Sequence, residues 1–453
     1  MTTRTAEDER SIARFQALVR IPTMSRLDES ETDFSQFDRF IAALPELYPA
    51  LHGVLERELI DGYSLLYRWR GSEPSAECAL EPTVLMAHYD VVPATEEGWI
   101  VPPFTAQIVP GASGDLIWGR GTLDDKGALV SILEGVEARV LAGFRPKRDV
   151  YLSFGHNEET TGAGASAIVD ELRRRGVRAA LVLDEGGAVV EGIFPGVAKP
   201  SAVVGVSEKG ITSMVLTVQQ LGGHASTPPR LTATARLARA IVRLNSKPFP
   251  ARFSPTNLEM IATLGAHASS PLKWVFTNLW LTRPVLVRMF ARLGDETNAM
   301  VRTTQAVTQL SGSLAANALA ERAVATVNVR IAVGSSVVEA MRHVRSAIND
   351  DGVQIEALHP SEPSPVSPTT GPAWELLART IEQTFDGVIV TPYIQLGASD
   401  SRHFTRISDH VYRFSPFEMT AEQRGTLHAV NERISVDTWL RGVRFYERLI
   451  GEL

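Results

Sequence analysis

Residues 150–185 read VYLSFGHNEETTGAGASAIVDELRRRGVRAALVLDE, and this stretch contains the clearest pattern of strands and helices in the chain. Its apolar runs at 150–154 and 180–183 predict two buried strands, and the helical spacing of apolar residues over 165–175 predicts a helix between them. Strands joined by such a helical crossover pair in parallel. The stretch therefore predicts an α/β fold with a mixed, mostly parallel sheet flanked by helices.

The same alternation continues on both sides of this unit. A strand is expected at 84–87 and a helix at 126–141. Near the C-terminus a helix at 373–385 and a strand at 388–393 return to the pattern. An amphipathic helix opens the chain and ends before Pro22.

Between these parts lies a run of elements with a different character. Strands and helices are expected there in the order β, α, β, α, β, at 211–220, 232–244, 324–331, 337–348 and 353–358. This order predicts a separate α+β unit. The stretch 257–304 is predicted only to be helical and apolar.

A connector rich in Pro and Ser, 359–372, is expected to leave this unit in an extended form. We therefore predict a first domain formed by 1–208 and 361–453, and a second domain, 209–360, inserted into it.

Composition limits the classes of protein. The 453 residues, 44% of them apolar, are enough for two hydrophobic cores. The formal charge is −7 and no basic cluster is interleaved with aromatic residues, so no nucleic-acid partner is expected. Cys78 is the only cysteine, which excludes an intramolecular disulfide and a metal site built on thiolates.

Two stretches of the sequence bear on the cellular location of the protein. The first 25 residues mix acidic and basic groups and contain no apolar run of the length that a signal peptide needs. The apolar stretch 274–293 contains Arg283 and Arg288, which a bilayer core tolerates badly. A cytoplasmic location, a small-molecule substrate and no membrane partner are expected.

Five short segments collect acidic and histidine residues near predicted strand ends. They are AHYDVVP (87–93), GRGTLDDKG (119–127), GHNEETTGAG (155–164), LDEGG (183–187) and LHAVNER (427–433). Each alone has an ordinary explanation as a turn, a helix cap or a solvated loop. Loops at the carboxyl edge of a parallel sheet form ligand sites, however, and convergence of all five predicts such a site.

Oxygen and imidazole ligands without thiolate suit zinc, with manganese and cobalt as competitors. Several carboxylates allow two metals to share one bridging aspartate and to activate a water molecule between them. We therefore expect two Zn²⁺ per chain.

The five segments, in this order, resemble the di-zinc metallopeptidase family of aminoacylase, carnosinase, glutamate carboxypeptidase and succinyl-diaminopimelate desuccinylase. The resemblance spans nearly the whole chain. It is strongest to the branch of carboxypeptidases and N-fatty-acyl-amino-acid hydrolases, through the stretches HNEETTGAGA, LDEGG, SEKG, HAVNERI and VYRFSP.

The resemblance implies a role for each residue of the site. It makes His88 and Asp184 ligands of one zinc, with Asp124 as the bridge. Glu159 and His428 are implied to bind the other zinc. Asp90 is implied to orient His88, and Glu158 to be the general base. The resemblance also implies a cis peptide bond between Asp124 and Asp125.

The inserted domain resembles the family's ferredoxin-like lid and dimerisation domain, which implies a possible homodimer. His224 is implied to donate to the oxyanion, and Asn317 and Arg330 to hold the substrate's free carboxylate. The family loop usually written GGTDSR reads GASDSR here, at 397–402, and it supplies Ser401 as a further substrate-binding candidate.

The implied activity is hydrolysis of an amide bond next to a free carboxylate, as in a carboxypeptidase, a dipeptidase or an N-acyl-amino-acid hydrolase. The apolar stretch 257–290 suggests that the pocket or its cover accepts a hydrophobic acyl or side chain.

The main alternative is a dinucleotide-binding oxidoreductase, since Gly162, Gly164 and Ala167 form a GxGxxA turn after a strand and Asp184 follows about 20 residues later. Glu158 and Glu159 argue against it, because they would repel a pyrophosphate at that turn.

Overall fold

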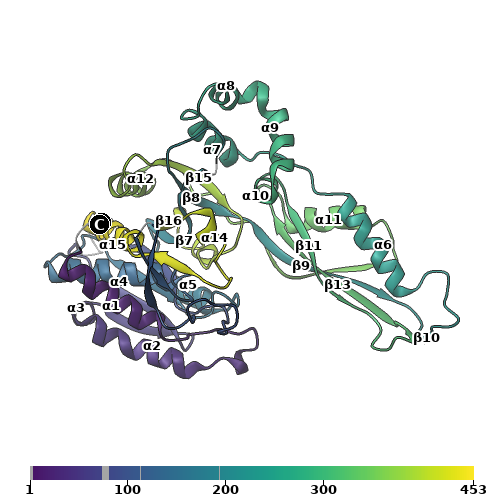
Figure 1. Cartoon of the computed structure of the whole chain (residues 1–453), viewed down its shortest axis with the longest axis horizontal. Coiled ribbons are helices and arrows are strands. Elements are labelled where there is room, and N and C mark those ends of the chain that lie inside the picture. Colours follow the sequence, from purple (N-terminus) through teal and green to yellow (C-terminus); the bar gives the residue numbers. More distant parts are fainter. Residues whose placement is uncertain (1–3, 74–80, 113, 193) are drawn as a thin grey trace.

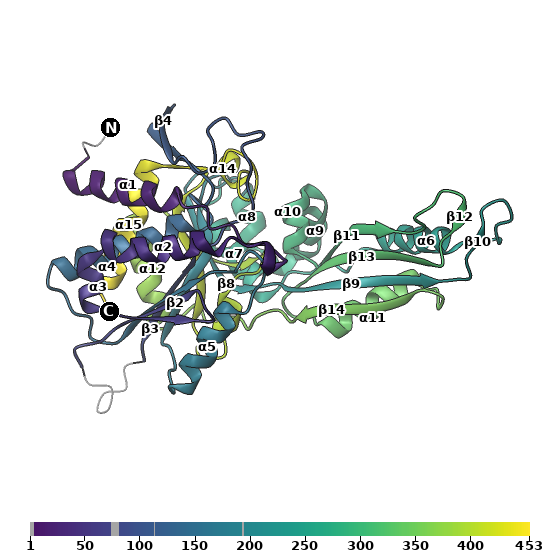
Figure 2. The ribbon, with the colours of Figure 1, turned by 90° about the horizontal axis from the view of Figure 1, so that it is seen from below.

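The computed structural model describes residues 4–73, 81–112, 114–192 and 194–453. Cys78 lies outside these residues. A large body is built around an eight-stranded sheet, and a narrower arm around a four-stranded sheet extends from it (Figure 1, Figure 2).

The large sheet has the order β1-β2-β6-β3-β7-β16-β8-β15. Its strands are β1 (Glu56–Ile60), β2 (Ser64–Trp69), β3 (Thr83–His88), β6 (Val150–Gly155), β7 (Leu181–Val190), β8 (Ser201–Glu208), β15 (Ile389–Gln395) and β16 (Val411–Glu418). Strand β3 pairs in parallel with β6 and β7, as do β7 with β16 and β8 with β15, whereas β1 and β2 are antiparallel. The prediction of a mixed, mostly parallel sheet flanked by helices is confirmed.

Helices cover both faces of this sheet. One face carries α1 (Ala6–Val19), α2 (Phe34–Leu47), α3 (Pro49–Val54), α4 (Lys126–Leu141), α12 (Pro372–Thr384) and α15 (Val436–Gly451). The other face carries α5 (Gly164–Arg174) and α13 (Ser401–Phe404). Helix α4 has the predicted bounds, and it is buried almost all round because α1, α3, α15 and strand β3 pack around it.

The arm has the sheet order β11-β13-β9-β14. Its elements are β9 (Gly210–Gln219), α6 (Ala233–Ser246), β11 (Thr304–Ser311), β13 (Arg322–Ile331), α11 (Val337–Ile348) and β14 (Gln354–Ser361). Strand β13 alternates buried and partly exposed side chains, because its buried face packs with α6 and α11. This is the ferredoxin-like arrangement expected for the insert.

The apolar stretch between α6 and β11 is helical, as predicted. It forms α7 (Pro255–Gly265), α8 (Leu272–Thr277), α9 (Leu279–Leu293) and α10 (Asp295–Met300). Its core residues, Ile261 and Phe276 among them, cluster with Phe194 and Ile389 at the β15 edge of the large sheet. The domain limits 1–208, 209–360 and 361–453 stay a prediction.

The remaining elements are small. They are the short 3₁₀ helix η1 (Glu29–Glu31), β4 (Gln107–Gly111), β5 (Gly114–Trp118), β10 (Gly223–His224), β12 (Ala318–Leu319), α14 (Ala421–Arg424) and β17 (Arg433–Ser435). No helix in the described parts of the chain is both long and apolar enough to cross a membrane. The cytoplasmic location stays a prediction.

Candidate metal centre

The structure brings the five acidic and histidine segments together at the carboxyl ends of the parallel strands β3 and β6 and beside the middle of β7. Two groups of side chains offer ligand atoms within 4.8 Å of one another. The first group is His88, Asp124 and Glu185, and the second is Asp124, Glu159 and His428. Asp124 is common to both groups.

Asp124 turns one carboxylate oxygen to each group. Its Oδ1 lies 3.0 Å from Nε2 of His88, and its Oδ2 lies 3.0 Å from Nε2 of His428. The same nitrogen of His428 is 3.0 Å from Oε2 of Glu159. The peptide bond between Asp124 and Asp125 is cis, as the resemblance implies.

The two acidic residues on β7 have different surroundings, and the expected role of Asp184 as a metal ligand stays a prediction. Glu185, not Asp184, faces His88, with 3.7 Å between Oε1 and Nε2. The buried carboxylate of Asp184 instead accepts a hydrogen bond from the backbone amide of Ser401 at 2.9 Å. The two neighbouring acids therefore make different contacts in this structure.

Asp90 ties two parts of the site together. Its carboxylate accepts hydrogen bonds from the backbone amides of Glu158 and Glu159, both at 3.2 Å, and from the Ser25 hydroxyl at 2.7 Å. It also lies 3.3 Å from Nδ1 of His88. Asp90 therefore positions the acidic loop after β6 and the imidazole at the end of β3.

Glu432 is a positioning residue that the sequence analysis did not identify. Its buried carboxylate accepts hydrogen bonds from the amides of Gly121, Leu123 and Asp124, and pairs with the Arg120 guanidinium at 2.6 Å. This holds the loop that carries Asp124 beside the segment that carries His428. Glu432 belongs to the segment LHAVNER, but the sequence of that segment does not indicate whether its side chain is buried or exposed to solvent.

The electrostatics of the site call for positive charge. Burial raises the pKa of Glu158 and of Glu185 well above the usual range, and the carboxylate of Asp124 adds to both shifts. Hydrogen bonds to Asp124 and Glu159 raise the pKa of His428 to about 10. Several acids in one desolvated place are unfavourable without a cation.

Two buried oxygen atoms without hydrogen-bond partners also indicate that this site suits a cation. Oε1 of Glu159 and Oδ1 of Asp125 are buried and have no hydrogen-bond partner in the described chain. Buried polar oxygens normally have one. Two imidazoles, a doubly facing carboxylate and unpaired oxygens without any thiolate fit hard or borderline divalent metals.

Residues expected on the substrate side fall into two places. Arg330 lies half-buried on β13, and its Nε donates to Asn328 Oδ1 at 3.1 Å. It is close enough to Lys209 and Arg402 for their charges to interact: burial, and then Arg330, lower the pKa of Lys209 to about 8. Lys209 and Arg402 were not identified from the sequence, although the SEKG and GASDSR stretches contain them.

His224 and Asn317 lie elsewhere. His224 is exposed on β10, which pairs with β12 immediately after Asn317. Both short strands lie at the end of the arm farthest from the large body (Figure 2). Within one chain, therefore, these two residues are not brought to the metal centre.

Ser401 is fully buried, and its hydroxyl lies 2.7 Å from that of Ser399. The Ser399 amide and hydroxyl both donate to Glu208, which pairs with Arg413 at 3.0 Å. The structure therefore places Ser401 in a buried network that fixes the 397–402 loop.

The glycines of the GxGxxA turn pack closely against neighbouring side chains. The Gly164 amide donates to the side chain of Asn157 at 3.2 Å. A side-chain carbon added at Gly162 would lie 2.1 Å from Asn157, and one at Gly164 would lie 2.3 Å from the Ser64 hydroxyl. These glycines serve close packing against Asn157 and Ser64, and the oxidoreductase alternative gains no support.

A sheet-edge cluster of two imidazoles and buried carboxylates, with Glu158 close by, defines the class of metal-dependent hydrolases. The chain belongs to peptidase family M20/M25/M40, whose sequence profile matches residues 84–452.

Proteins with similar sequences support the membership of this family. The chain is 38% identical to N-fatty-acyl-amino acid synthase/hydrolase PM20D1 of Xenopus tropicalis, over 99% of this chain and 87% of the relative. It is 30% identical to carboxypeptidase S of Saccharomyces cerevisiae, over 97% and 84%. The expected family and metallo-hydrolase class are confirmed.

Solved structures share the fold. The M20 family metallo-carboxypeptidase Sso-CP2 of Sulfolobus solfataricus has a TM-score of 0.68 at 15% identity, with 97% of this chain and 98% of that chain covered. Human carnosine dipeptidase 1 has a TM-score of 0.64 at 14% identity, with 98% and 96% covered.

Proposed function

We propose that the chain is a di-zinc hydrolase that cleaves an amide bond next to a free carboxylate, with N-acyl amino acids and peptide C-termini as the substrate class. The observation that carries this proposal is the contact of Asp124 with His88 on one side and His428 on the other. Manganese or cobalt would suit the same oxygen and nitrogen donors.

In this proposal His88, Asp124 and Glu185 hold one ion, and Asp124, Glu159 and His428 hold the other. When bound, the pair supplies Lewis-acid activation of a water molecule near neutral pH. Glu185 takes the place first expected for Asp184, because its carboxylate is the one that faces His88.

Glu158 acts as the proton carrier. Its backbone is held by Asp90, so its carboxylate stays beside the ligand Glu159. Burial raises the pKa of this carboxyl, so its carboxylate would be a stronger base once bound cations keep it ionised; it could then accept a proton from the attacking water and pass it to the leaving nitrogen. Such a carrier typically contributes a factor of about 10²–10⁴ in rate.

Three cations near the junction of body and arm are proposed to bind the free carboxylate of the substrate. Arg330 offers a guanidinium suited to two parallel hydrogen bonds, and Lys209 and Arg402 add positive charge beside it. This proposal extends to Lys209 and Arg402 the role that the resemblance implies for Asn317 and Arg330.

An apolar acyl chain is proposed to lie in a cavity next to Lys209. The cavity has a volume of about 610 Å³, and Phe253, Met300 and Ile394 are among the side chains that line it. A pocket of this size and character suits an apolar group of a small-molecule substrate. The similarity to N-fatty-acyl-amino acid synthase/hydrolase PM20D1 supports this choice.

A homodimer is proposed to complete the site. His224 is exposed at the far end of the arm, so it reaches a metal centre only if a second copy of the chain presents it. In a closed twofold dimer each arm reaches toward the body of the other copy, and the relation holds in both directions.

The test of this function compares two neighbouring substitutions. Glu158→Gln should keep the bound zinc, measured by elemental analysis, and lose about 10²–10⁴ in turnover. Glu159→Gln should instead lose zinc, because it removes a ligand. Substantial turnover by the Glu158→Gln variant would contradict the assigned base.

The substrate class is tested with amides of one amino acid whose acyl groups lengthen from acetyl to a long fatty chain, together with dipeptides. Longer acyl chains should raise kcat/KM. Capping the free carboxylate as an amide should abolish most of the activity. A preference for small polar acyl groups would contradict the proposed apolar pocket.

A further inference from the structure

Helix α9 exposes an apolar stripe to solvent. Leu281, Val285, Met289 and Leu293 follow one another at a spacing of four residues, and their side chains are 36–66% exposed. Residues at this spacing lie on one face of a helix. Trp280 at the start of the helix is 83% exposed.

The helix is nevertheless firmly attached to the body. Leu286 and Phe290 lie on its opposite face and are buried, and the Phe290 ring meets Phe253 edge-on with ring centroids 5.2 Å apart. The exposed stripe is therefore a second apolar face, which packing within the chain does not explain. Contiguous exposed apolar surface of this kind marks a contact with another body.

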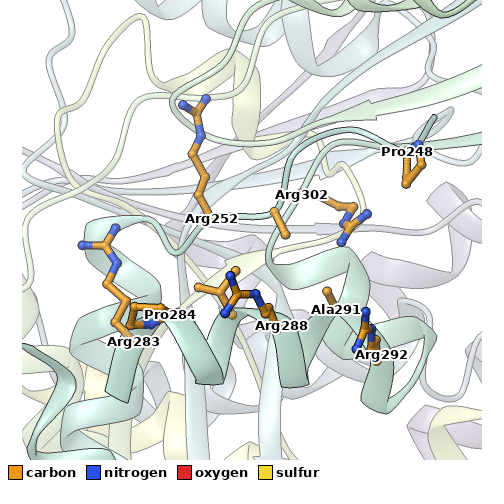
Figure 3. Close-up of a pocket in the computed structure, with 10 residues that line it drawn as sticks. Pro248, Arg252, Arg283, Pro284, Arg288, Ala291, Arg292 and Arg302 are labelled. Carbon is orange, nitrogen blue, oxygen red and sulfur yellow. The ribbon is translucent and has the colours of Figure 1, made fainter. Parts of the chain in front are cut away.

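Arginines gather beside this stripe. A cavity of about 690 Å³ is lined by five of them: Arg252, Arg283, Arg288, Arg292 and Arg302. Figure 3 shows the three arginines of α9 following one another along the helix, with the other two across the cavity from it. None of the five forms an ion pair with a carboxylate in the parts of the chain that the structure describes.

The local charge is opposite to that of the whole chain. The chain carries −7, yet residues 260–294 contain no Asp or Glu, while Lys273 and three arginines fall within them. Arg288 and Arg292 each precede a stripe residue by one position, so the cations border the apolar face directly.

The position of the helices fits a contact with a broad surface. In Figure 1, α8 lies at the top of the molecule and α9 runs from it toward α10, where the arm begins. Trp274 of α8 is also mostly exposed. Tryptophan is enriched where proteins meet the headgroup region of a bilayer.

We propose that the α8–α9 face docks on the surface of an anionic lipid bilayer. Trp280 and the stripe would enter the headgroup and acyl boundary, and the arginines would bind the phosphates of the headgroups. A protruding apolar face bordered by cations is the pattern of helices that lie in a membrane interface. A bilayer offers apolar chains and anionic phosphates side by side, which matches this adjacency.

The docking is independent of the reaction that the metal centre performs. It concerns a surface contact and requires no membrane-spanning segment. Under the proposed function it would bring the pocket close to amphiphilic substrates held in the same bilayer.

The test is co-sedimentation of the full chain with vesicles. The protein should bind vesicles of equimolar phosphatidylcholine and phosphatidylglycerol, and bind phosphatidylcholine alone much less. Raising the salt concentration should weaken the binding. Failure to bind the mixed vesicles would overturn the proposal.

Two variants separate the contributions. Leu281→Ser with Val285→Ser and Met289→Ser removes the stripe, and Arg288→Glu with Arg292→Glu reverses the charge. Each should weaken partition onto mixed vesicles by about tenfold or more. All five side chains are solvent-facing, so circular dichroism and the thermal midpoint should stay close to the wild-type values.

The matched control is Arg39→Glu with Arg345→Glu, which reverses two exposed arginines on α2 and α11. This variant has the same net charge as the α9 charge variant and should bind like the wild type. Equal loss of binding in both would show a general charge effect and overturn the proposal. If the wild type does not bind vesicles and the stripe variant dissociates a dimer, the α8–α9 face contacts a second copy of the chain and the membrane proposal is overturned.

Discussion

Asp124 and the pair Asp184–Glu185 show how the site is decided at the scale of single residues. Asp124 contacts both imidazoles because each of its oxygens faces a different one. Asp184 and Glu185 are adjacent acids on one strand, and Oε1 of Glu185 lies 3.7 Å from Nε2 of His88. The other, Asp184, is used to hold the amide of Ser401.

Substitutions of this pair should have different effects on bound metal. Glu185→Gln should lower the zinc content from about two ions to about one per chain, because a ligand carboxylate is lost. Asp184→Asn should keep both ions, since its amide oxygen still accepts from Ser401. Elemental analysis after dialysis measures the zinc content of both variants. Loss of zinc from Asp184→Asn but not from Glu185→Gln would show that Asp184 is the ligand.

At the scale of elements, the site depends on loops held by buried carboxylates. The loop before α4 donates three backbone amides to Glu432, and Arg120 completes the set. The loop after β6 donates two amides to Asp90. Each carboxylate joins segments far apart in the sequence, so the ligands keep their positions without relying on regular secondary structure.

Glu432→Gln should therefore destabilise the protein. The amide cannot accept from all four donors, and it leaves the buried Arg120 without its partner charge. The expected loss is about 3–5 kcal/mol, measured from the urea midpoint. Zinc affinity should fall about 10–100-fold, because Asp124 loses its support.

The control for this variant is Glu422→Gln. Glu422 also pairs with an arginine, Arg433, but its side chain is 78% exposed. Its substitution should therefore barely change the urea midpoint, since ion pairs in solvent contribute little. Equal destabilisation by the two variants would contradict the role assigned to Glu432.

At the scale of the whole molecule, the arm separates residues that one site is expected to use. His224 and Asn317 lie at its far end, whereas Arg330 lies where the arm meets the body. The length of the arm thus makes the proposed second copy a requirement for His224 to act on substrate.

Mixing two inactive variants tests this requirement. Glu158→Gln and His224→Ala should each have little activity alone. After subunit exchange, the mixed dimer has one site with an intact Glu158 from one copy and an intact His224 from the other. Activity should recover to about one quarter of the wild type with random pairing. If mass measurements show that the subunits have exchanged but the activity does not recover, the proposed site shared between two copies is contradicted.

The sequence alone predicted the alternation of strands and helices, five of the six elements of the insert's α+β unit and the five segments that meet at the candidate metal centre, but it did not predict strand β11. These features depend on local patterns: apolar periodicity fixes each element, and parallel strands place their carboxyl ends at one edge. The bounds of α4 follow from its pattern alone.

The tertiary structure was needed to show that Glu185 contacts His88, that Glu432 is buried, that the charges of Lys209 and Arg402 act on Arg330, and that α7–α10 cover the β15 edge. The physical reason is that these properties depend on the direction of a side chain and on the neighbours that desolvate it. Those neighbours come from distant parts of the chain, as Arg120 and Glu432 do, and no local pattern specifies them.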